Sequence, residues 1–71
     1  MNMVPVSSSN LASIGYDESS KILYVSFRNG RMYKYSGVPH HIYSGLMSAS
    51  SHGQYFDRYI VKGGYAYQRV S

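Results

Sequence analysis

Cysteine is absent from the 71-residue sequence. The chain therefore has no disulfide framework and no zinc site with cysteine ligands, two devices on which many small domains depend. We expect aromatic packing, sheet hydrogen bonds and self-association into a homo-oligomer through exposed sheet edges to stabilise the fold. A reducing compartment suits such a chain, so we expect a cytoplasmic protein.

Long apolar runs are missing as well. No stretch approaches the roughly 20 residues that a membrane-spanning helix requires. Residues 1–6 also lack the basic and apolar regions of a signal peptide. The length fits one domain, residues 1–71 with its core at about residues 4–70, and we expect no membrane association.

Acidic residues are scarce: three Asp or Glu stand against seven Lys or Arg, which gives a net charge of +4. Positive charge favours encounters with polyanions such as RNA, DNA and nucleotides, although a generally soluble surface explains it equally well. Three of the basic residues lie in segment 28–34 and three more in segment 58–69, so we expect one basic face.

Tyrosine, by contrast, is abundant, with nine copies. A phenol ring offers an apolar face that stacks on a nucleobase and a hydroxyl that forms hydrogen bonds. The same rings also fill the cores of small proteins. The composition therefore leaves each tyrosine open to two roles, base stacking and core packing.

Alternation of apolar and polar residues indicates β-structure. Leu23, Val25 and Phe27 recur with period two and fall on one face of a strand. Turn residues separate this strand from its neighbours along the chain. We predict strands at residues 14–16, 22–28, 31–36 and 65–70.

The loop of the central hairpin decides which way the tyrosines point, because a one-residue slip reverses every side chain. A two-residue turn at Asn29–Gly30 places Lys34 opposite Val25, whereas a three-residue loop with left-handed Gly30 places Tyr33 there. We favour the three-residue loop because it gives one consistent apolar face. It leaves the opposite face to Tyr24, Ser26, Met32 and Lys34.

Helical spacing follows the hairpin. Val38–Pro39 is a suitable helix start, because the missing N–H of proline has no partner in a first turn. Val38, Ile42, Leu46 and Ala49 then recur at the spacing of a helix that covers the sheet. Residues 48–53 end this helix, and residues 54–60 form a second short helix or one wrapped turn.

These elements predict an α+β fold. Its small antiparallel sheet is a three-strand meander plus a returning C-terminal strand, and one or two short helices lie on one face of the sheet.

The ordered series of residues resembles a known family, the KTSC domain, which is found at the C-terminus of some lysyl-tRNA synthetases and as a stand-alone bacterial or phage protein. The resemblance spans about residues 4–70 and implies the fold above and a role in RNA binding. Asp57 departs from the family pattern, which often has asparagine after the Tyr-Phe pair. The resemblance rests on Ser8, Ser9, Ile14-Gly15-Tyr16-Asp17, Leu23-x-Val25-x-Phe27, Gly30, Tyr33-x-Tyr35, Val38-Pro39, Tyr43, Leu46, Ala49-x-Ser51-x-Gly53-x-Tyr55-Phe56, Tyr65, Tyr67 and Val70.

Tyr33 and Tyr35 share one strand face and are the first candidates for a base-stacking platform. The alternative is that both rings pack beneath the helix as core residues. In that case we expect the binding surface on the opposite sheet face. Its members would be Tyr24, Arg28, Lys34, Tyr65, Tyr67 and Arg69.

Segment 51–56 is a second candidate, because free backbone donors at a helix start can receive a phosphate and Gly53 lets a ligand approach the backbone. The alternative is structural: Gly53 ends the first helix, and Ser51 or Gln54 caps the next turn.

Catalytic signatures are missing, since the sequence has no nucleophile elbow, phosphate loop or dinucleotide fingerprint. His40, His41 and His52 lack the further ligands that a metal site requires. We therefore predict a non-enzymatic protein with no catalytic residue, no metal and no cofactor.

The sequence favours a non-catalytic module that binds RNA or single-stranded nucleic acid. Two alternatives stay open: a phage or prophage protein that sequesters a small nucleotide, and a protein–protein interaction module. The predicted binding residues are Tyr24, Arg31, Tyr33, Lys34, Tyr35, Ser51, Gly53, Tyr55, Phe56, Arg58, Tyr65, Tyr67 and Arg69.

Overall fold

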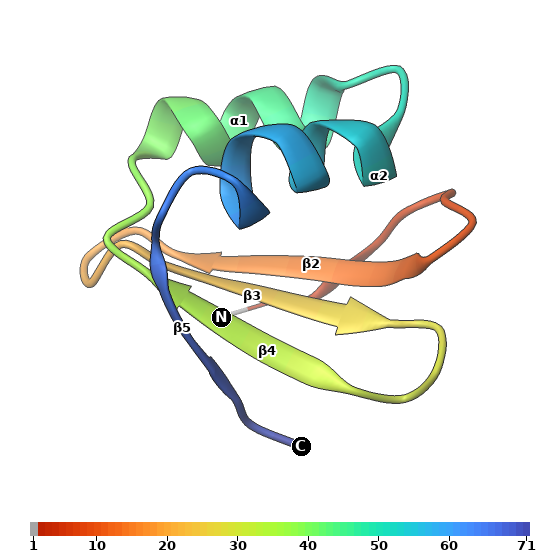
Figure 1. The fold of residues 1–71 in the computed structure, drawn as a ribbon, viewed down its shortest axis with the longest axis horizontal. Coiled ribbons are helices and arrows are strands. Elements are labelled where there is room, and N and C mark those ends of the chain that lie inside the picture. Colours follow the sequence, from red (N-terminus) through yellow and green to blue (C-terminus); the bar gives the residue numbers. More distant parts are fainter. Residues whose placement is uncertain (1) are drawn as a thin grey trace.

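A twisted antiparallel sheet with a helical layer on one face makes up the computed structural model, which describes residues 2–71 (Figure 1). Met1, which the predicted domain includes, lies outside the described residues. The α+β class predicted from the sequence is confirmed. In chain order the elements are β1 (Val4–Pro5), β2 (Leu11–Asp17), β3 (Ile22–Phe27), β4 (Met32–Ser36), α1 (His40–Ser48), α2 (His52–Tyr55), the π-helix η1 (Phe56–Val61) and β5 (Ala66–Arg69).

The sheet differs from the predicted three-strand meander plus a returning strand. Within residues 2–71 it has five strands in the order β1-β2-β3-β4-β5, so each strand pairs with its sequence neighbour. The additional strand is β1, in which Val4 pairs with Ile14 and Pro5 with Ser13. An edge strand tolerates proline because one of its sides needs no backbone donor. Because β1 has only two residues, it is too short to show an alternating pattern, and the sequence analysis did not predict it.

The central hairpin has the predicted three-residue loop. The Gly30 amide donates to the Phe27 carbonyl at 3.0 Å, and Gly30 has a φ of +89°. Val25 therefore lies opposite Tyr33, and Leu23 opposite Tyr35. The preferred register is confirmed, and it turns both tyrosines toward the helical layer.

Helix α1 begins at His40, one residue later than predicted. The Val38 amide donates to the Lys21 carbonyl at 2.9 Å, and the Tyr16 hydroxyl donates to the Val38 carbonyl at 2.5 Å. Val38 is thereby held outside the helix, and Pro39 is extended, with its carbonyl accepting the first helical hydrogen bonds.

A close approach joins α1 to α2. An alanine Cβ at Gly45 would lie 2.8 Å from Cζ of Tyr55, so only glycine lets the Tyr55 ring pack there. The glycine weakens the helix by about 1 kcal/mol relative to alanine. The close contact with Tyr55 is the physical reason for a glycine at position 45 despite this cost.

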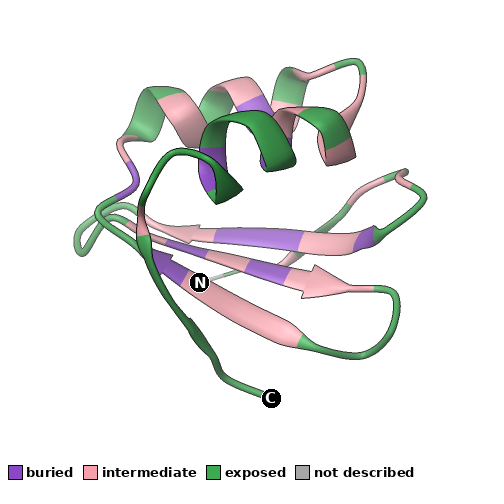
Figure 2. Ribbon diagram, in the orientation of Figure 1, coloured by how far each residue is buried: buried purple, intermediate pink, exposed green. Residues whose placement is uncertain are grey.

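The core lies between the sheet and the helices, where buried residues of β2, β3 and β4 face α1 and η1 (Figure 2). Strand β5 is different, because all four of its residues are exposed. The helical layer therefore covers the middle of the sheet and leaves the β5 edge open. The buried hydrophobic residues are Leu11, Ile14, Leu23, Val25, Tyr35, Val38, Leu46, Phe56 and Ile60.

Candidate functional site

A row of aromatic rings crosses the open edge of the sheet. The rings of Tyr33 and Phe27 have centroids 5.8 Å apart, and those of Tyr33 and Tyr67 are 6.2 Å apart. We call Phe27, Tyr33 and Tyr67 the edge patch. Offset and edge-to-face arrangements at such distances are the favoured geometries of aromatic pairs.

Burial separates the rings of the edge patch from those beneath it. Tyr67 is 68% exposed, and Phe27 and Tyr33 are half-buried. Tyr35 and Phe56 are buried and pack edge to face with centroids 5.5 Å apart. These two predicted site residues therefore belong to the core, where they offer no free ring face and instead support the patch from below.

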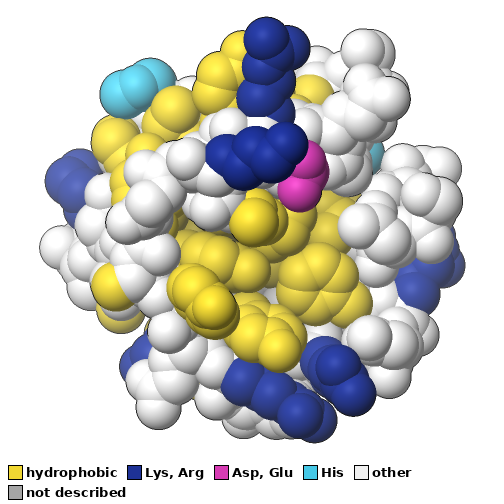
Figure 3. Space-filling view, viewed as in Figure 1, with side chains coloured by type: hydrophobic (Ala, Val, Ile, Leu, Met, Phe, Trp, Pro, Cys, Tyr) yellow, Lys and Arg dark blue, Asp and Glu magenta, His cyan; other side chains and the backbone are white. Residues whose placement is uncertain are grey.

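Two arginines lie on the same face as the patch. Arg69 is directly opposite Tyr33 across the β4–β5 ladder, and directly paired residues point to the same side. Arg31 precedes Tyr33 by two positions, and its carbonyl accepts from the Phe27 amide at 2.8 Å, so alternation places it on that side too. Figure 3 shows the hydrophobic surface with basic side chains both at the sheet edge and over the helical layer.

The register of β5 corrects one sequence-based expectation. Tyr67 pairs with Tyr35, and Gln68 pairs with Lys34. Tyr67 and Arg69 therefore face the helical side of the sheet, whereas Tyr24 and Lys34, which pair with each other, face the opposite side. The predicted grouping of Tyr24 and Lys34 with Tyr67 and Arg69 is wrong, because the β5 register reverses its side chains relative to that grouping.

Arg28, the remaining basic member of that grouping, is held by the N-terminal loop. Its Nε donates to the Ser8 carbonyl at 2.6 Å, and its backbone amide donates to the Asn10 carbonyl at 2.9 Å. These contacts attach the loop at residues 7–10 to the end of β3, where Phe27 begins the edge patch.

Other predicted site residues lie on the helical layer. The Tyr55 and Tyr59 rings have centroids 4.5 Å apart, and Arg58 lies 5.9 Å from the Tyr59 ring. Together with the segment at residues 49–51 and Gln54 they line a pocket of about 290 Å³. Tyr65 is half-buried against the core. The sequence-predicted residues are thus distributed over more than one surface.

Burial raises the pKa of three tyrosine hydroxyls above the ordinary value. For Tyr35 burial is the largest cause, and neighbouring Tyr33 and Tyr67 raise the pKa further. Burial also raises the pKa of Tyr55 and of Tyr16, with smaller contributions from Tyr59 and Tyr65 and from Glu18, respectively. All three hydroxyls therefore ionise only at a higher pH than an ordinary tyrosine does.

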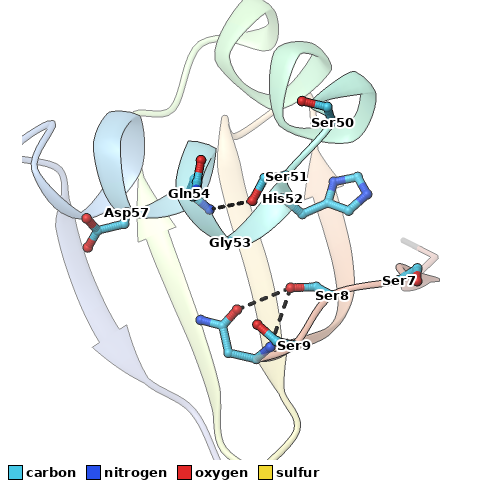
Figure 4. Close-up of a pocket in the computed structure, with 10 residues that line it drawn as sticks. Ser7, Ser8, Ser9, Ser50, Ser51, His52, Gly53, Gln54 and Asp57 are labelled. Atoms are coloured by element: carbon cyan, nitrogen blue, oxygen red, sulfur yellow. Dashed lines mark hydrogen bonds between the residues drawn. The ribbon is translucent and has the colours of Figure 1, made fainter.

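A polar pocket of about 680 Å³ lies between the loop at residues 7–10 and the segment at residues 50–57 (Figure 4). Ser51 caps α2, because its Oγ accepts from the Gln54 amide at 3.3 Å. A Cβ at Gly53 would lie 2.7 Å from Oδ1 of Asn10, so this glycine allows the loop to approach the helix. The predicted serine cap is confirmed, but Gly53 lies inside α2 and does not end α1.

Two connections through the core link the walls of the pocket to the edge patch. Leu11, next to Asn10 of the pocket, pairs with Phe27 of the patch. Asp57 of the pocket follows Phe56, whose ring contacts Phe27 with centroids 5.6 Å apart. Sequence reasoning missed the contribution of Phe27 and Asn10, because alternation marked Phe27 only as a core residue and Asn10 lies outside any periodic segment.

Among residues 2–71 no group of three or more His, Cys, Asp or Glu side chains is arranged to hold a metal ion. Nδ1 of His52 lies 2.8 Å from the Leu46 carbonyl, and Nδ1 of His40 lies 3.0 Å from Glu18. In the same described range no helix has the length and apolar character needed to cross a membrane.

The arrangement of sheet, helices and edge is that of an established family. The KTSC domain model matches residues 7–65, and the chain belongs to this family. A crystal structure of a KTSC domain protein from Yersinia pestis superimposes with a TM-score of 0.91 at 38% identity, covering 99% of this chain and 97% of that one.

Two further relatives are similar in sequence. An uncharacterized protein of Stutzerimonas stutzeri (strain A1501) is 37% identical over 70 residues, which is 99% of each chain. A protein of Tsukamurella paurometabola is 38% identical over 53 residues, 75% of this chain and 79% of that protein. The family resemblance inferred from the sequence is confirmed.

Proposed function

We propose that the protein is a non-catalytic module that binds RNA or single-stranded nucleic acid at the edge patch. The observation that carries the proposal is the exposed Tyr67 ring, which lies beside Tyr33 on a sheet face that also presents Arg31 and Arg69. Stacking on an exposed ring requires an unpaired base, which single strands offer and duplexes do not.

The expected energetics fit a modest binder. Each stacked base contributes roughly 1–3 kcal/mol in proteins that bind single strands. Arginine contributes through phosphate contacts that release counterions, and these contacts do not depend on sequence. Two rings and two arginines on one short strand pair therefore suit a segment of a few nucleotides. Such a partner fits the cytoplasm as the place of action.

A single nucleotide is a second candidate ligand. The polar pocket favours it, because the serine hydroxyls that line this pocket can form hydrogen bonds with the sugar and phosphate of one nucleotide. A protein that sequesters nucleotides would show a thermal shift with mononucleotides and none with RNA. Binding of both ligands at the same surface would support the single-strand proposal.

A salt titration tests the primary proposal. With one phosphate neutralised by each of Arg31 and Arg69, the slope of log K against log salt for a short single-stranded RNA should be about −1.4. Replacing one contacting arginine, as in Arg69→Gln, should make the slope shallower by about 0.7. Arg28→Gln is not a suitable control because Arg28 holds the N-terminal loop. Lys21, an exposed residue of the β2–β3 turn, is the better site, and Lys21→Gln should leave the slope unchanged.

Absence of binding to any oligonucleotide at low salt would remove the proposal. In that case the exposed β5 edge would favour a protein partner, which strand pairing at an open edge can recruit. Recovery of one stoichiometric protein partner after nuclease treatment would identify that role.

A further inference from the structure

An acidic residue stands at the border of an otherwise basic site. Asp57 lies in the first turn of η1 and lines the polar pocket, and Figure 4 shows its carboxylate pointing away from the helix. In Figure 3 one acidic group lies directly beside the hydrophobic patch, over the helical layer. A carboxylate repels phosphate, so this position suits a different part of a nucleotide.

The Asp57 carboxylate is available to a ligand. Its only described ion pair is with Lys62, at 3.4 Å between Oδ2 and Nζ, and both side chains are largely exposed, at 60% and 72%. An exposed ion pair of this kind contributes little and is readily exchanged. Lys62 would then remain beside the site as a cation for the phosphate backbone.

Nucleobases differ in what they offer a carboxylate. An ionised carboxylate has two oxygens that only accept hydrogen bonds. The Watson–Crick edge of guanine presents two adjacent donors, N1–H and the N2 amino group. Adenine and cytosine place an acceptor next to their amino donor, and uracil has one donor between two acceptors. Guanine is therefore the base that pairs with a carboxylate through two parallel hydrogen bonds.

Position links this chemistry to the stacking surface. Asp57 directly follows Phe56, and the Phe56 ring packs on Phe27 of the edge patch. Figure 4 shows the Asp57 side chain pointing from η1 toward the side of the molecule on which β4 and β5 lie, and these strands carry Tyr33 and Tyr67 of the patch. Single-stranded RNA is commonly read on that Watson–Crick edge, because no complementary strand occupies it.

We propose that Asp57 makes the edge patch selective for guanine, by accepting hydrogen bonds from N1–H and the N2 amino group of the stacked base. This inference rests on the proposed function, because it assumes that a base stacks on the patch. It adds a preferred base to a site whose rings and arginines alone bind any sequence.

Binding of short uridine oligonucleotides that vary at one central position tests the inference. Fluorescence anisotropy should give an affinity about tenfold higher for guanosine than for adenosine, cytidine or uridine at that position. Inosine keeps N1–H but lacks the amino group, so its affinity should fall between guanosine and the rest.

Asp57→Asn provides the matched variant. An amide has one acceptor oxygen and cannot receive two parallel hydrogen bonds, so the preference for guanosine should fall to less than about twofold. Binding to the other bases should be equal or tighter, because a negative charge has been removed. Glu18→Gln makes the same charge change in the β2–β3 turn and should keep the preference intact.

Three outcomes are distinguishable. Preference for guanosine that is lost in Asp57→Asn and kept in Glu18→Gln supports the inference. Equal binding of all bases by the unmodified protein, or a preference that survives in Asp57→Asn, overturns the inference and leaves the proposed function intact. Failure to bind every oligonucleotide overturns the proposed function and the inference together.

Discussion

Two tyrosine clusters at different places on the sheet show how the same residue type serves different purposes. At the start of α1, Tyr16 and Tyr43 stack with ring centroids 4.5 Å apart and planes 9° from parallel. At the β5 edge, Tyr33 and Tyr67 are tilted by 49° at 6.2 Å. In the first pair each ring stacks face to face on the other, and we call it the closed cluster. The second pair, the open cluster, leaves the Tyr67 ring 68% exposed.

The difference follows from what lies above each cluster. The Tyr16 hydroxyl donates to the Val38 carbonyl at 2.5 Å, so this ring fixes the chain where it enters α1. His40 contacts both rings edge to face, with centroids 6.1 and 5.9 Å away. Strand β5, in contrast, is fully exposed. The number of tyrosines alone therefore does not identify a binding surface. What matters is whether neighbouring elements cover each ring or leave it exposed.

The largest expected effect concerns the closed cluster. Tyr16→Ala removes a ring stacked on Tyr43 and a hydrogen bond to the Val38 backbone, and we expect a loss of about 2–3 kcal/mol in the free energy of unfolding. Urea denaturation measures this change. The folded variant should bind RNA as before, and reduced binding without a loss of stability would break the contrast between the clusters.

The next effect concerns the open cluster, where we expect a loss of RNA affinity without a loss of stability. Tyr67→Ala should weaken RNA binding by about 1–3 kcal/mol, the value of one stacked base. Because Tyr67 is 68% exposed, the free energy of unfolding should change little. Tyr67→Phe keeps the ring and should retain most of the affinity. Anisotropy and urea denaturation on the same samples compare the two quantities, and strong destabilisation by Tyr67→Ala would assign this ring to the core.

A smaller effect appears at alkaline pH. Because burial raises the pKa of Tyr35 in the folded state, its contribution to stability is fully present below about pH 10, the unfolded value. That contribution is lost as the pH rises through the folded-state pKa, because the unfolded chain releases the proton first. Urea denaturation across this range should show falling stability, with a shallower fall in Tyr35→Phe. Equal slopes for the two proteins would contradict the buried position of Tyr35.

The sequence predicted the parts of the fold that depend on local pattern. Alternation at Leu23, Val25 and Phe27 and a left-handed Gly30 were sufficient for the hairpin register. Strand β1 was missed because its two residues, one of them proline, carry no pattern. The start of α1 was misplaced because Val38 is held by hydrogen bonds from residues distant in sequence, which no local rule reveals.

The candidate site was only partly accessible from the sequence. Tyr33, Tyr67, Arg31 and Arg69 were named as candidates, but which sheet face Tyr67 occupies depends on the β4–β5 register. That register pairs residues distant in sequence, and alternation within β5 is consistent with either face. Tyr35 and Phe56 look identical to surface aromatics in the sequence, and only the packing of η1, which begins at Phe56, onto the sheet makes them core residues.

Chemical-shift perturbation by a short single-stranded RNA tests the central claim most directly. We predict the largest amide shifts at Tyr33, Tyr67 and Arg69, and no shifts at Tyr16 and Tyr43. Shifts confined to the Tyr16–Tyr43 cluster, or to Tyr24 and Lys34 on the opposite sheet face, would contradict the account, as would a spectrum that the RNA leaves unchanged.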